Sequence, residues 1–153
     1  MTERNSVVAH FLDGTLIKGF IQDFTPHRPS FHVFPMDSDN GILISLSQLK
    51  AVFFVRDLAG NPTREDLRGF IAAPAESVHG RKIAVRFSDG EVMCGYSLSY
   101  SLRREGFFMF PADKASNNLR IYVMLRSATE VREGAEAQEL AQKALRGPER
   151  DVA

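Results

Sequence analysis

The chain repeats a long stretch of its own sequence, and this repeat constrains the fold more than any other feature. Phe11-Leu12-Asp13-Gly14 returns as Phe87-Ser88-Asp89-Gly90. The segment 31–37 returns as 107–113, and both pairs are offset by 76 residues (87 − 11 and 107 − 31). Residues of the first copy that meet an identical residue at this offset include Phe11, Asp13, Gly14, Gly19, Phe31, Phe34, Pro35 and Asp37. Such a repeat predicts two copies of one small folding unit.

Each copy is composed of short apolar runs separated by turn residues. Asp-Gly pairs at 13–14 and 89–90 predict hairpin turns, because glycine adopts a positive φ without a Cβ clash. After Asp113 the alignment shifts to an offset of 77, which matches Ile44 with Ile121 and Ala51 with Ala128. The expected strands are 7–11, 16–24, 31–34, 42–47 and 51–55, followed by 83–87, 92–100, 107–110, 119–125 and 128–132.

Five short strands in about 50 residues indicate a small β-barrel or a strongly curved sheet, because closure removes exposed edges. The predicted fold class is therefore mainly β, with two repeated five-stranded small barrels of the SH3-like kind and a C-terminal α-helix. The first barrel is expected over 6–56 and the second over 81–132. Each unit alone has a thin core, so the two are expected to pack together about a pseudo-two-fold axis.

Two segments lie outside the repeat. The connector 57–80 contains a short helix start at Thr63, and glycines and a proline keep any helix there short. The tail 133–147 is predicted to be a helix that Gly147-Pro148 ends. Its apolar stripe consists of Ala137, Leu140, Ala141, Ala144 and Leu145. We expect this stripe to dock on its own chain, with pairing to another chain as the alternative.

Composition is typical of a globular protein without a strong electrostatic partner. The 153 residues carry equal numbers of basic and acidic side chains, so no overall field attracts nucleic acid or an anionic membrane. The N-terminal residues lack the apolar stretch of a signal peptide, and the run 51–55 is far too short to cross a bilayer. A single cysteine, Cys94, is typical of a reducing compartment. We predict a cytoplasmic protein without membrane insertion.

One segment resembles a known family. The sequence Gly19-Phe20-Ile21-Gln22-Asp23-Phe24-Thr25 is similar to the second-strand segment of PilZ domains, bacterial barrels that bind cyclic di-GMP. In that family a glycine-bearing strand leads into an Asp/Asn-x-Ser-x-x-Gly turn, and an Arg-x-x-x-Arg pair precedes the barrel. The turn corresponds here to 23–28 and 99–104. Over 7–132 the chain resembles uncharacterised bacterial tandem PilZ-like domains, which implies a role in signalling.

The resemblance implies a set of ligand- or partner-contact residues, but the motif is incomplete. Thr25 keeps the turn hydroxyl of the family pattern, whereas arginine replaces the closing glycine in both turns and places a bulky cation where the ligand would approach. We therefore expect a degenerate domain that does not bind cyclic di-GMP, with a phosphate contact as the alternative role of these arginines. The candidate contact residues are Arg28, Arg64, Arg68, Ser99, Ser101, Arg103 and Arg104.

The sequence offers no convincing catalytic or metal-binding set. A metal site from His10, His27, His32 and Asp13 is conceivable, but the spacing is not compact and the second copy has Arg86, Arg103 and Phe108 at the three histidine positions. Cys94 has no histidine at a fixed spacing that would activate its thiol. We predict no catalytic residues, no metal, no cofactor and no enzymatic activity.

The second copy is the more basic one. Residues 80–132 contain nine Lys and Arg against five Asp and Glu, whereas 6–56 contain four of each. This excess could serve a nucleotide or an RNA strand together with aromatic side chains. The residues concerned are Arg103, Arg104, Arg120, Arg126, Tyr96, Tyr100 and Tyr122. A solvated face is the favoured interpretation. We predict a non-catalytic regulatory or protein-interaction module that binds a protein partner or its own copy rather than a small molecule or nucleic acid.

Overall fold

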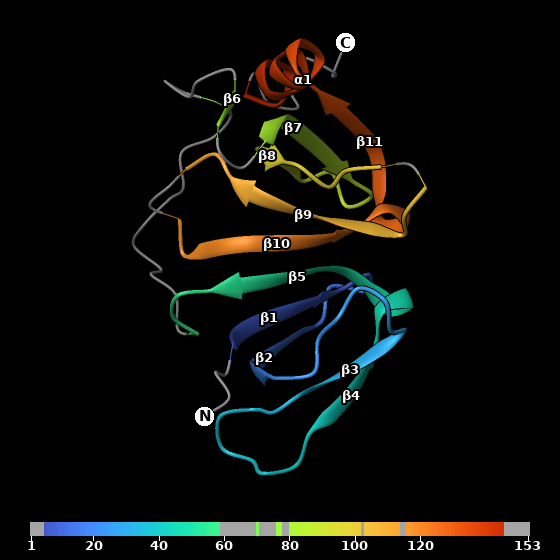
Figure 1. The fold of residues 1–153 in the computed structure, drawn as a ribbon, viewed down its shortest axis with the longest axis vertical. Coiled ribbons are helices and arrows are strands. Elements are labelled where there is room, and N and C mark those ends of the chain that lie inside the picture. Colours follow the sequence, from blue (N-terminus) through green and yellow to red (C-terminus); the bar gives the residue numbers. More distant parts are fainter. Residues whose placement is uncertain are drawn as a thin grey trace.

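The computed structural model describes residues 5–58, 70, 76–77, 80–101, 103–113 and 116–145. The fold is mainly β, with one α-helix at the C-terminal end of the described chain (Figure 1). The strands of the first half are β1 Asn5–Phe11, β2 Leu16–Ile21, β3 Ser30–Val33, β4 Ile42–Ser45 and β5 Leu49–Val55. The later elements are β6 Glu76–Ser77, β7 Gly80–Phe87, β8 Val92–Ser97, β9 Gly106–Pro111, β10 Asn118–Met124, β11 Ala128–Glu133 and α1 Ala135–Leu145.

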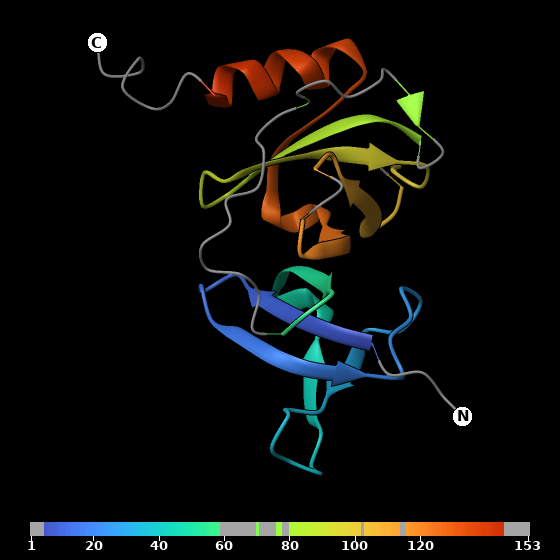
Figure 2. The same ribbon diagram turned by 90° about the vertical axis from the view of Figure 1, so that its left-hand side faces the viewer.

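One long sheet runs through both halves of the molecule. Its strand order is β11-β7-β8-β9-β10-β5-β1-β2, and β6 pairs with β7 beside this path. Strands β3 and β4 form a separate antiparallel pair, which a bridge between Phe20 and Phe34 connects to β2. The sheet bends strongly but is not closed, so β11 and β4 keep an edge without a strand in the described residues (Figures 1 and 2).

The two halves use the same strand pairings. Phe31 lies opposite Ile44 in the first half, and Phe107 lies opposite Val123 in the second. Phe107 therefore corresponds to Phe31 at an offset of 76 residues (107 − 31), and Val123 corresponds to Ile44 at an offset of 79 (123 − 44). The offset of 77 predicted after Asp113 is therefore wrong, because the loop before β10 holds more extra residues than the one-residue slip allowed. Positions related in this way are called matched positions below.

The seam between the halves joins strands that are not matched. β5 pairs antiparallel with β10, for example through Val52 opposite Tyr122. The strand matched to β5 is β11, and the strand matched to β10 is β4. A two-fold axis would map this contact onto a β11–β4 pair, which the sheet order lacks. The predicted pseudo-two-fold relation is therefore wrong, and the junction is head-to-tail.

The hairpin turns follow directly from their Asp-Gly pairs. Gly14 and Gly90 have φ of 92° and 94°, values that favour glycine. The carboxylate of Asp13 accepts a hydrogen bond from the backbone N–H of Thr15 at 2.8 Å, and Asp89 does the same for Glu91 at 2.9 Å. These local bonds form an Asx-type turn and need no tertiary contact.

Strands β2 and β8 end earlier than the predicted 24 and 100. In the first half the hydroxyl of Thr25 accepts a bond from the backbone N–H of His27 at 3.4 Å. In the second half the hydroxyl of Ser101 accepts one from Arg103 at 3.2 Å. Side chains that bond nearby backbone groups compete with the sheet ladder, so the chain turns here instead of extending.

The core of each half includes residues from the other half. Alternate side chains of a strand point to opposite faces. On β5, Val52 and Phe54 pack in the core of the first half, whereas Ala51, Phe53 and Val55 pack in the core of the second. From β10, Tyr122 and Met124 join the first core. The paired strands β5 and β10 therefore contribute one face to each of two separate apolar cores.

The tail helix docks on its own chain, as expected. α1 contacts β7, β8 and β11. The buried side chains of its predicted stripe are Ala137, Leu140 and Ala141, which pack with Ala84 and Tyr96. The helix begins at Ala135 and not at the predicted residue 133, because Glu133 belongs to β11 and Gly134 has a φ of 61°. Residues 146–147 of the predicted helix lie outside the described residues. The short helix predicted in 57–80 lies mostly outside the described residues.

Candidate functional site

The candidate contact residues from the sequence lie on two matched turns. Ser99, Ser101, Arg103 and Arg104 belong to the turn between β8 and β9, and both arginines are exposed. Arg28 is exposed on the matched turn between β2 and β3, so it does not join the four others in one half. Arg64 and Arg68 lie outside the described residues. The structure thus groups the serines with Arg103 and Arg104.

Two side chains of the matched turns occupy positions whose counterparts in PilZ domains contact the ligand. Here both form hydrogen bonds with groups of the protein. The hydroxyl of Ser99 accepts a hydrogen bond from the backbone N–H of Phe108 at 3.2 Å. At the matched position, the carboxylate of Asp23 accepts a hydrogen bond from the backbone N–H of His32 at 3.1 Å. The Nδ1 atom of the His32 ring lies 2.9 Å from the same carboxylate. Although burial acts to raise the pKa of Asp23, these bonds hold it below its usual value. Both side chains therefore serve to hold the next strand.

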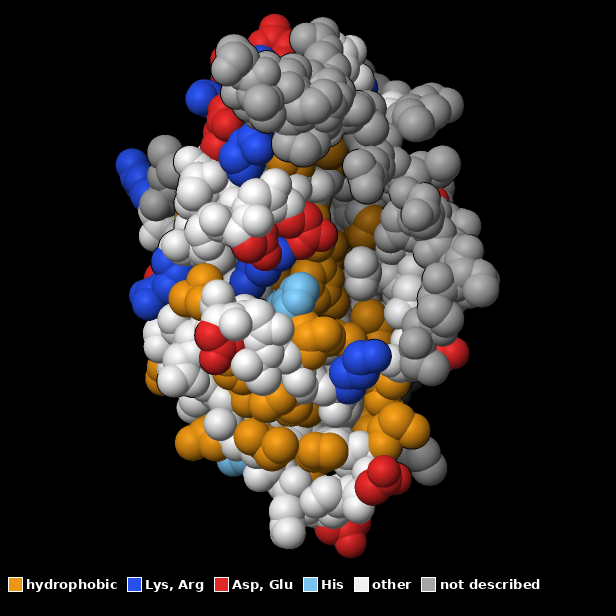
Figure 3. All heavy atoms as spheres, turned by 180° about the vertical axis from the view of Figure 1, so that it is seen from behind, with side chains coloured by type: hydrophobic (Ala, Val, Ile, Leu, Met, Phe, Trp, Pro, Cys, Tyr) orange, Lys and Arg blue, Asp and Glu red, His pale blue; other side chains and the backbone are white. Residues whose placement is uncertain are grey.

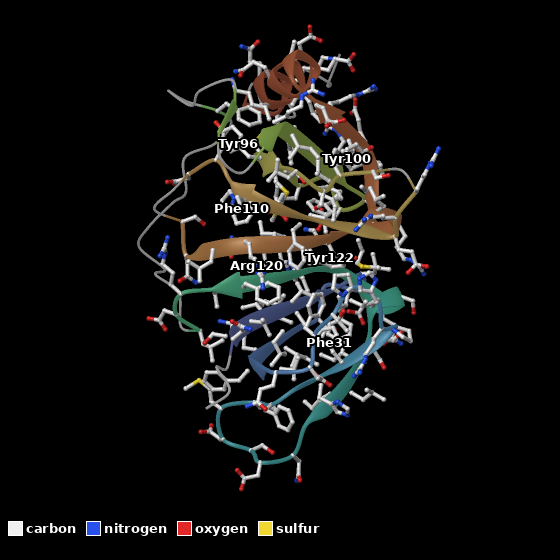
Figure 4. All side chains as sticks on the ribbon, viewed as in Figure 1. Phe31, Tyr96, Tyr100, Phe110, Arg120 and Tyr122 are labelled. Atoms are coloured by element: carbon white, nitrogen blue, oxygen red, sulfur yellow. The ribbon has the colours of Figure 1, made fainter. Side chains whose placement is uncertain are left out.

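The tyrosines of the basic half do not form one face. Tyr96 packs beneath α1, Tyr100 joins the core of the second half, and Tyr122 joins the core of the first (Figure 4). Only 4% of the surface of Tyr122 is exposed. Arg126 reaches the backbone carbonyl of Ser47 at 3.5 Å. Tyr96 and Tyr122 are buried and Tyr100 is half-buried, so the three rings do not form a shared stacking platform for bases.

A buried lysine at the seam was not found by sequence reasoning. The ladder between β1 and β5 skips Lys50, which forms a bulge and is 4% exposed. Its ammonium group donates to Asp89 at 2.6 Å and to Glu91, and lies 4.6 Å from the ring centroid of Phe87. The hydrogen bond from Lys50 keeps the pKa of Asp89 below its usual value. The cluster thus links β5 of the first half to the first hairpin of the second.

His10 lies beside this cluster. Its ring packs edge-on against Phe53 at 5.4 Å between centroids, and its Nδ1 is buried without a hydrogen-bond partner among the described residues. Burial, and then the nearby charge of Lys50, lower the pKa of His10. Figure 3 shows a histidine with basic and acidic side chains near the middle of this face, beside a band of apolar side chains. One lysine inside the apolar run 49–55 is the sequence signal that could have indicated the cluster.

A second partly buried cation lies at the seam on β10. The guanidinium of Arg120 packs against two neighbouring aromatic rings, 4.4 Å from the centroid of Phe54 and 4.6 Å from that of Phe108, and the two centroids lie 6.0 Å apart. Burial lowers the pKa of Arg120. The sequence marked Arg120 only as part of a basic excess. The stack was not predictable, because its three members come from three different strands.

Strand β4 has a free edge and carries exposed apolar side chains. Leu43 is 63% exposed and Ile42 is 41% exposed, whereas Ile44 points into the first core. On its inner side β4 pairs with β3, for example through Leu43 opposite His32. The outer side of β4 carries no strand within the described chain.

The described residues provide neither a metal site nor a membrane-spanning helix. No group of three His, Cys, Asp or Glu side chains is placed there to hold a metal ion. Where the structure describes the chain, no helix combines the length and apolar character that crossing a bilayer needs.

Comparison with known proteins gives one match. The model of a family described as a family of unknown function (DUF6982) matches residues 3–134, which is most of the chain. No curated protein and no solved structure matches the chain.

Proposed function

Since the chain belongs to this family of unknown function, we propose its role from its own residues: it is a non-catalytic regulatory module that binds an extended strand of a partner protein along β4. The observation that carries the proposal is the free edge of β4, where Leu43 and Ile42 are exposed. An unpaired edge with apolar side chains is a template for strand addition, in which backbone hydrogen bonds supply affinity.

In the second half, the edge that is matched to the free edge of β4 is already paired with another strand. β10 is the strand matched to β4, and its outer edge is paired with β5. Tyr122, at the position matched to Leu43, is 4% exposed because β5 and the first core cover it. We expect the partner strand on β4 to resemble β5, which is apolar on both faces.

A partner protein fits this edge better than a second copy does. Among the described residues, β6 is only two residues long and β2 is joined to the β3 side by a bridge, so the other long strand with a free outer edge is β11, which is matched to β5. Its outward positions hold Glu130 and Arg132, where β5 has Ala51 and Phe53. Placing these charges against the apolar core of another copy costs several kcal/mol of desolvation free energy. Head-to-tail growth is therefore disfavoured.

Two finer assignments remain proposals beside this function. The first is a pair of five-stranded, SH3-like barrel units, which the matched pairings and matched turns support. The second is a PilZ-like relationship, supported by the glycines that let a carbonyl approach closely: a Cβ on Gly19 would lie 2.4 Å from the oxygen of Phe34, and on Gly95 2.1 Å from that of Phe110. The alternative of nucleotide or RNA binding has less support, because Tyr96 and Tyr122 are buried and the three tyrosines lie in different cores.

A peptide with the sequence of β5, flanked by lysines for solubility, tests the proposal on the full chain. Isothermal titration and backbone amide shifts are expected to show binding at β4. Leu43→Lys places a charge on the edge and should weaken binding about tenfold, or about 1.4 kcal/mol. Leu98→Lys is the matched control, since Leu98 is 78% exposed on the turn after β8.

Two results would contradict the proposal. One is peptide binding that Leu43→Lys leaves unchanged. The other is light scattering that shows the free protein to be a dimer which Leu43→Lys dissociates, because the occupant of the edge would then be a second copy.

A further inference from the structure

The two partly buried cations at the seam differ in how their charge is balanced. Lys50 has two carboxylates within hydrogen-bond reach, Asp89 and Glu91. No described residue gives the guanidinium of Arg120 a hydrogen bond or an ion pair. Its contacts with the rings of Phe54 and Phe108 are cation–π contacts. A charge taken partly out of water without a partner is costly. The arrangement therefore calls for an anion from outside the chain.

The two rings pack around one side of the Arg120 guanidinium. Their centroids lie only 6.0 Å apart, so they do not enclose both of its faces. A planar fork of N–H donors fits a carboxylate or a phosphate through two parallel hydrogen bonds. Two phenylalanines restrict the rotation of the side chain, which lowers the entropy lost on binding.

The surrounding residues hold the stack in place. The backbone N–H of Phe108 donates to Ser99 at 3.2 Å, and its carbonyl accepts a bond from the hydroxyl of Ser97 at 2.7 Å. Tyr122, two residues along β10 from Arg120, packs 4.9 Å from the ring of Phe108. The serines of the β8–β9 turn thus position one wall of the site, while β5 supplies the other through Phe54.

We propose that the guanidinium of Arg120, packed against Phe54 and Phe108, is a binding site for an oxyanion of a ligand, either a carboxylate or a phosphate. The site lies on β10 at the seam and uses no residue of the β4 edge. It is therefore independent of the proposed strand binding, and either can fail without the other.

The test follows the Nε–H resonance of Arg120 by NMR in the full chain. Sodium phosphate and sodium acetate are titrated separately, with chloride replaced to keep ionic strength constant. We expect a saturable shift of this resonance with one or both anions, and the stronger of the two identifies the oxyanion. Arg103→Met, which removes an exposed arginine of the β8–β9 turn, should leave the titration unchanged.

Two variants of Arg120 make the test decisive. Arg120→Lys keeps the charge but loses the planar fork, so the midpoint measured from backbone amides near β10 should rise at least about fivefold. Arg120→Met should abolish the saturable shift of those amides. A linear response up to 100 mM of either anion, or the same midpoint in wild type and Arg120→Lys, would overturn the proposal. Should Arg120→Met not fold, the lysine variant still decides.

Discussion

Strands β5 and β11 occupy the same place in the two halves, yet their surroundings are opposite. Each pairs with the first strand of its half, β5 with β1 and β11 with β7. All residues of β5 are buried, whereas β11 has no buried residue. One strand became an internal seam and the other stayed an edge.

The outward-facing residues explain this difference. At the positions where β5 has Ala51 and Phe53, β11 has Glu130 and Arg132. The carboxylate of Glu130 accepts a hydrogen bond from Arg132 at 2.8 Å, and this bond holds the pKa of Glu130 below its usual value. Charged side chains on an edge strand discourage further pairing. The comparison teaches that matched strands share pairing partners but that their outward residues decide whether a second edge is covered.

The largest effect is expected when β5 is given the charge of β11. Phe53→Arg places an uncompensated cation in the second core, where Phe53 is 6% exposed, and should lower the free energy of unfolding by about 3–5 kcal/mol. Urea unfolding followed by circular dichroism measures the change. Arg132→Phe is the matched control and should change stability by less than about 1 kcal/mol. Equal losses in both variants would contradict the difference between the two strands.

A smaller effect is expected at the bulge position that the two strands share. Lys50 in β5 is a buried ammonium, whereas Thr129 at the matched position in β11 is exposed and bonds the carbonyl of Arg86 at 3.2 Å. Asp89→Asn with Glu91→Gln leaves Lys50 buried without a carboxylate and should cost about 2–3 kcal/mol. Lys50→Met should cost about 1 kcal/mol, because it leaves carboxylates that water can reach.

The same cluster predicts a dependence of stability on pH. The pKa of Asp89 is lowered in the folded protein, so its contribution is present above the unfolded value near 3.8 and is lost as pH falls through the folded value. Wild type should therefore lose more stability than Lys50→Met when urea unfolding is repeated below about pH 4. Parallel pH profiles would show that Lys50 does not act through Asp89.

The smallest change in stability, but a change in assembly, is expected when β11 is made like β5. Glu130→Ala with Arg132→Phe removes the charges that protect the edge and should alter unfolding by less than about 1 kcal/mol. Light scattering after gel filtration should show a mass that rises with concentration more than in wild type, as β11 pairs with β4 of another copy. Adding Leu43→Lys should reverse this. A double variant as monomeric as wild type would show that other features close the β11 edge.

The strands were largely predictable because their signals are local. The Asp-Gly turns set φ through Gly14 and Gly90, and apolar runs between them became β1, β2, β7 and β8 close to the expected residues. Strand ends were harder, since the bonds of Thr25 and Ser101 to the backbone compete with the ladder only once the turn has formed. The predicted offset of 77 after Asp113 was wrong, because identical residues do not show how many residues a loop between two strands holds.

The candidate site was only partly predictable. Ser99 and Ser101 were expected on one turn, and both lie there, but they bond backbone groups of their own half. The stack of Arg120 on Phe54 and Phe108 depends on β5 and β10 lying side by side. Residues 54, 108 and 120 are separated in the chain, and no local pattern connects them.

The sequence by itself determined the repeat of short strands, their turns and the apolar stripe of the tail helix, because glycine geometry, prolines and side-chain alternation act within a few residues. Only the tertiary structure decided which strand edges meet. The β5–β10 pairing depends on the burial of both faces of β5. Phe53 makes one of these faces apolar, whereas Arg132 at the matched position of β11 makes that face charged. The free β4 edge and the uncompensated Arg120 follow from that choice of partners.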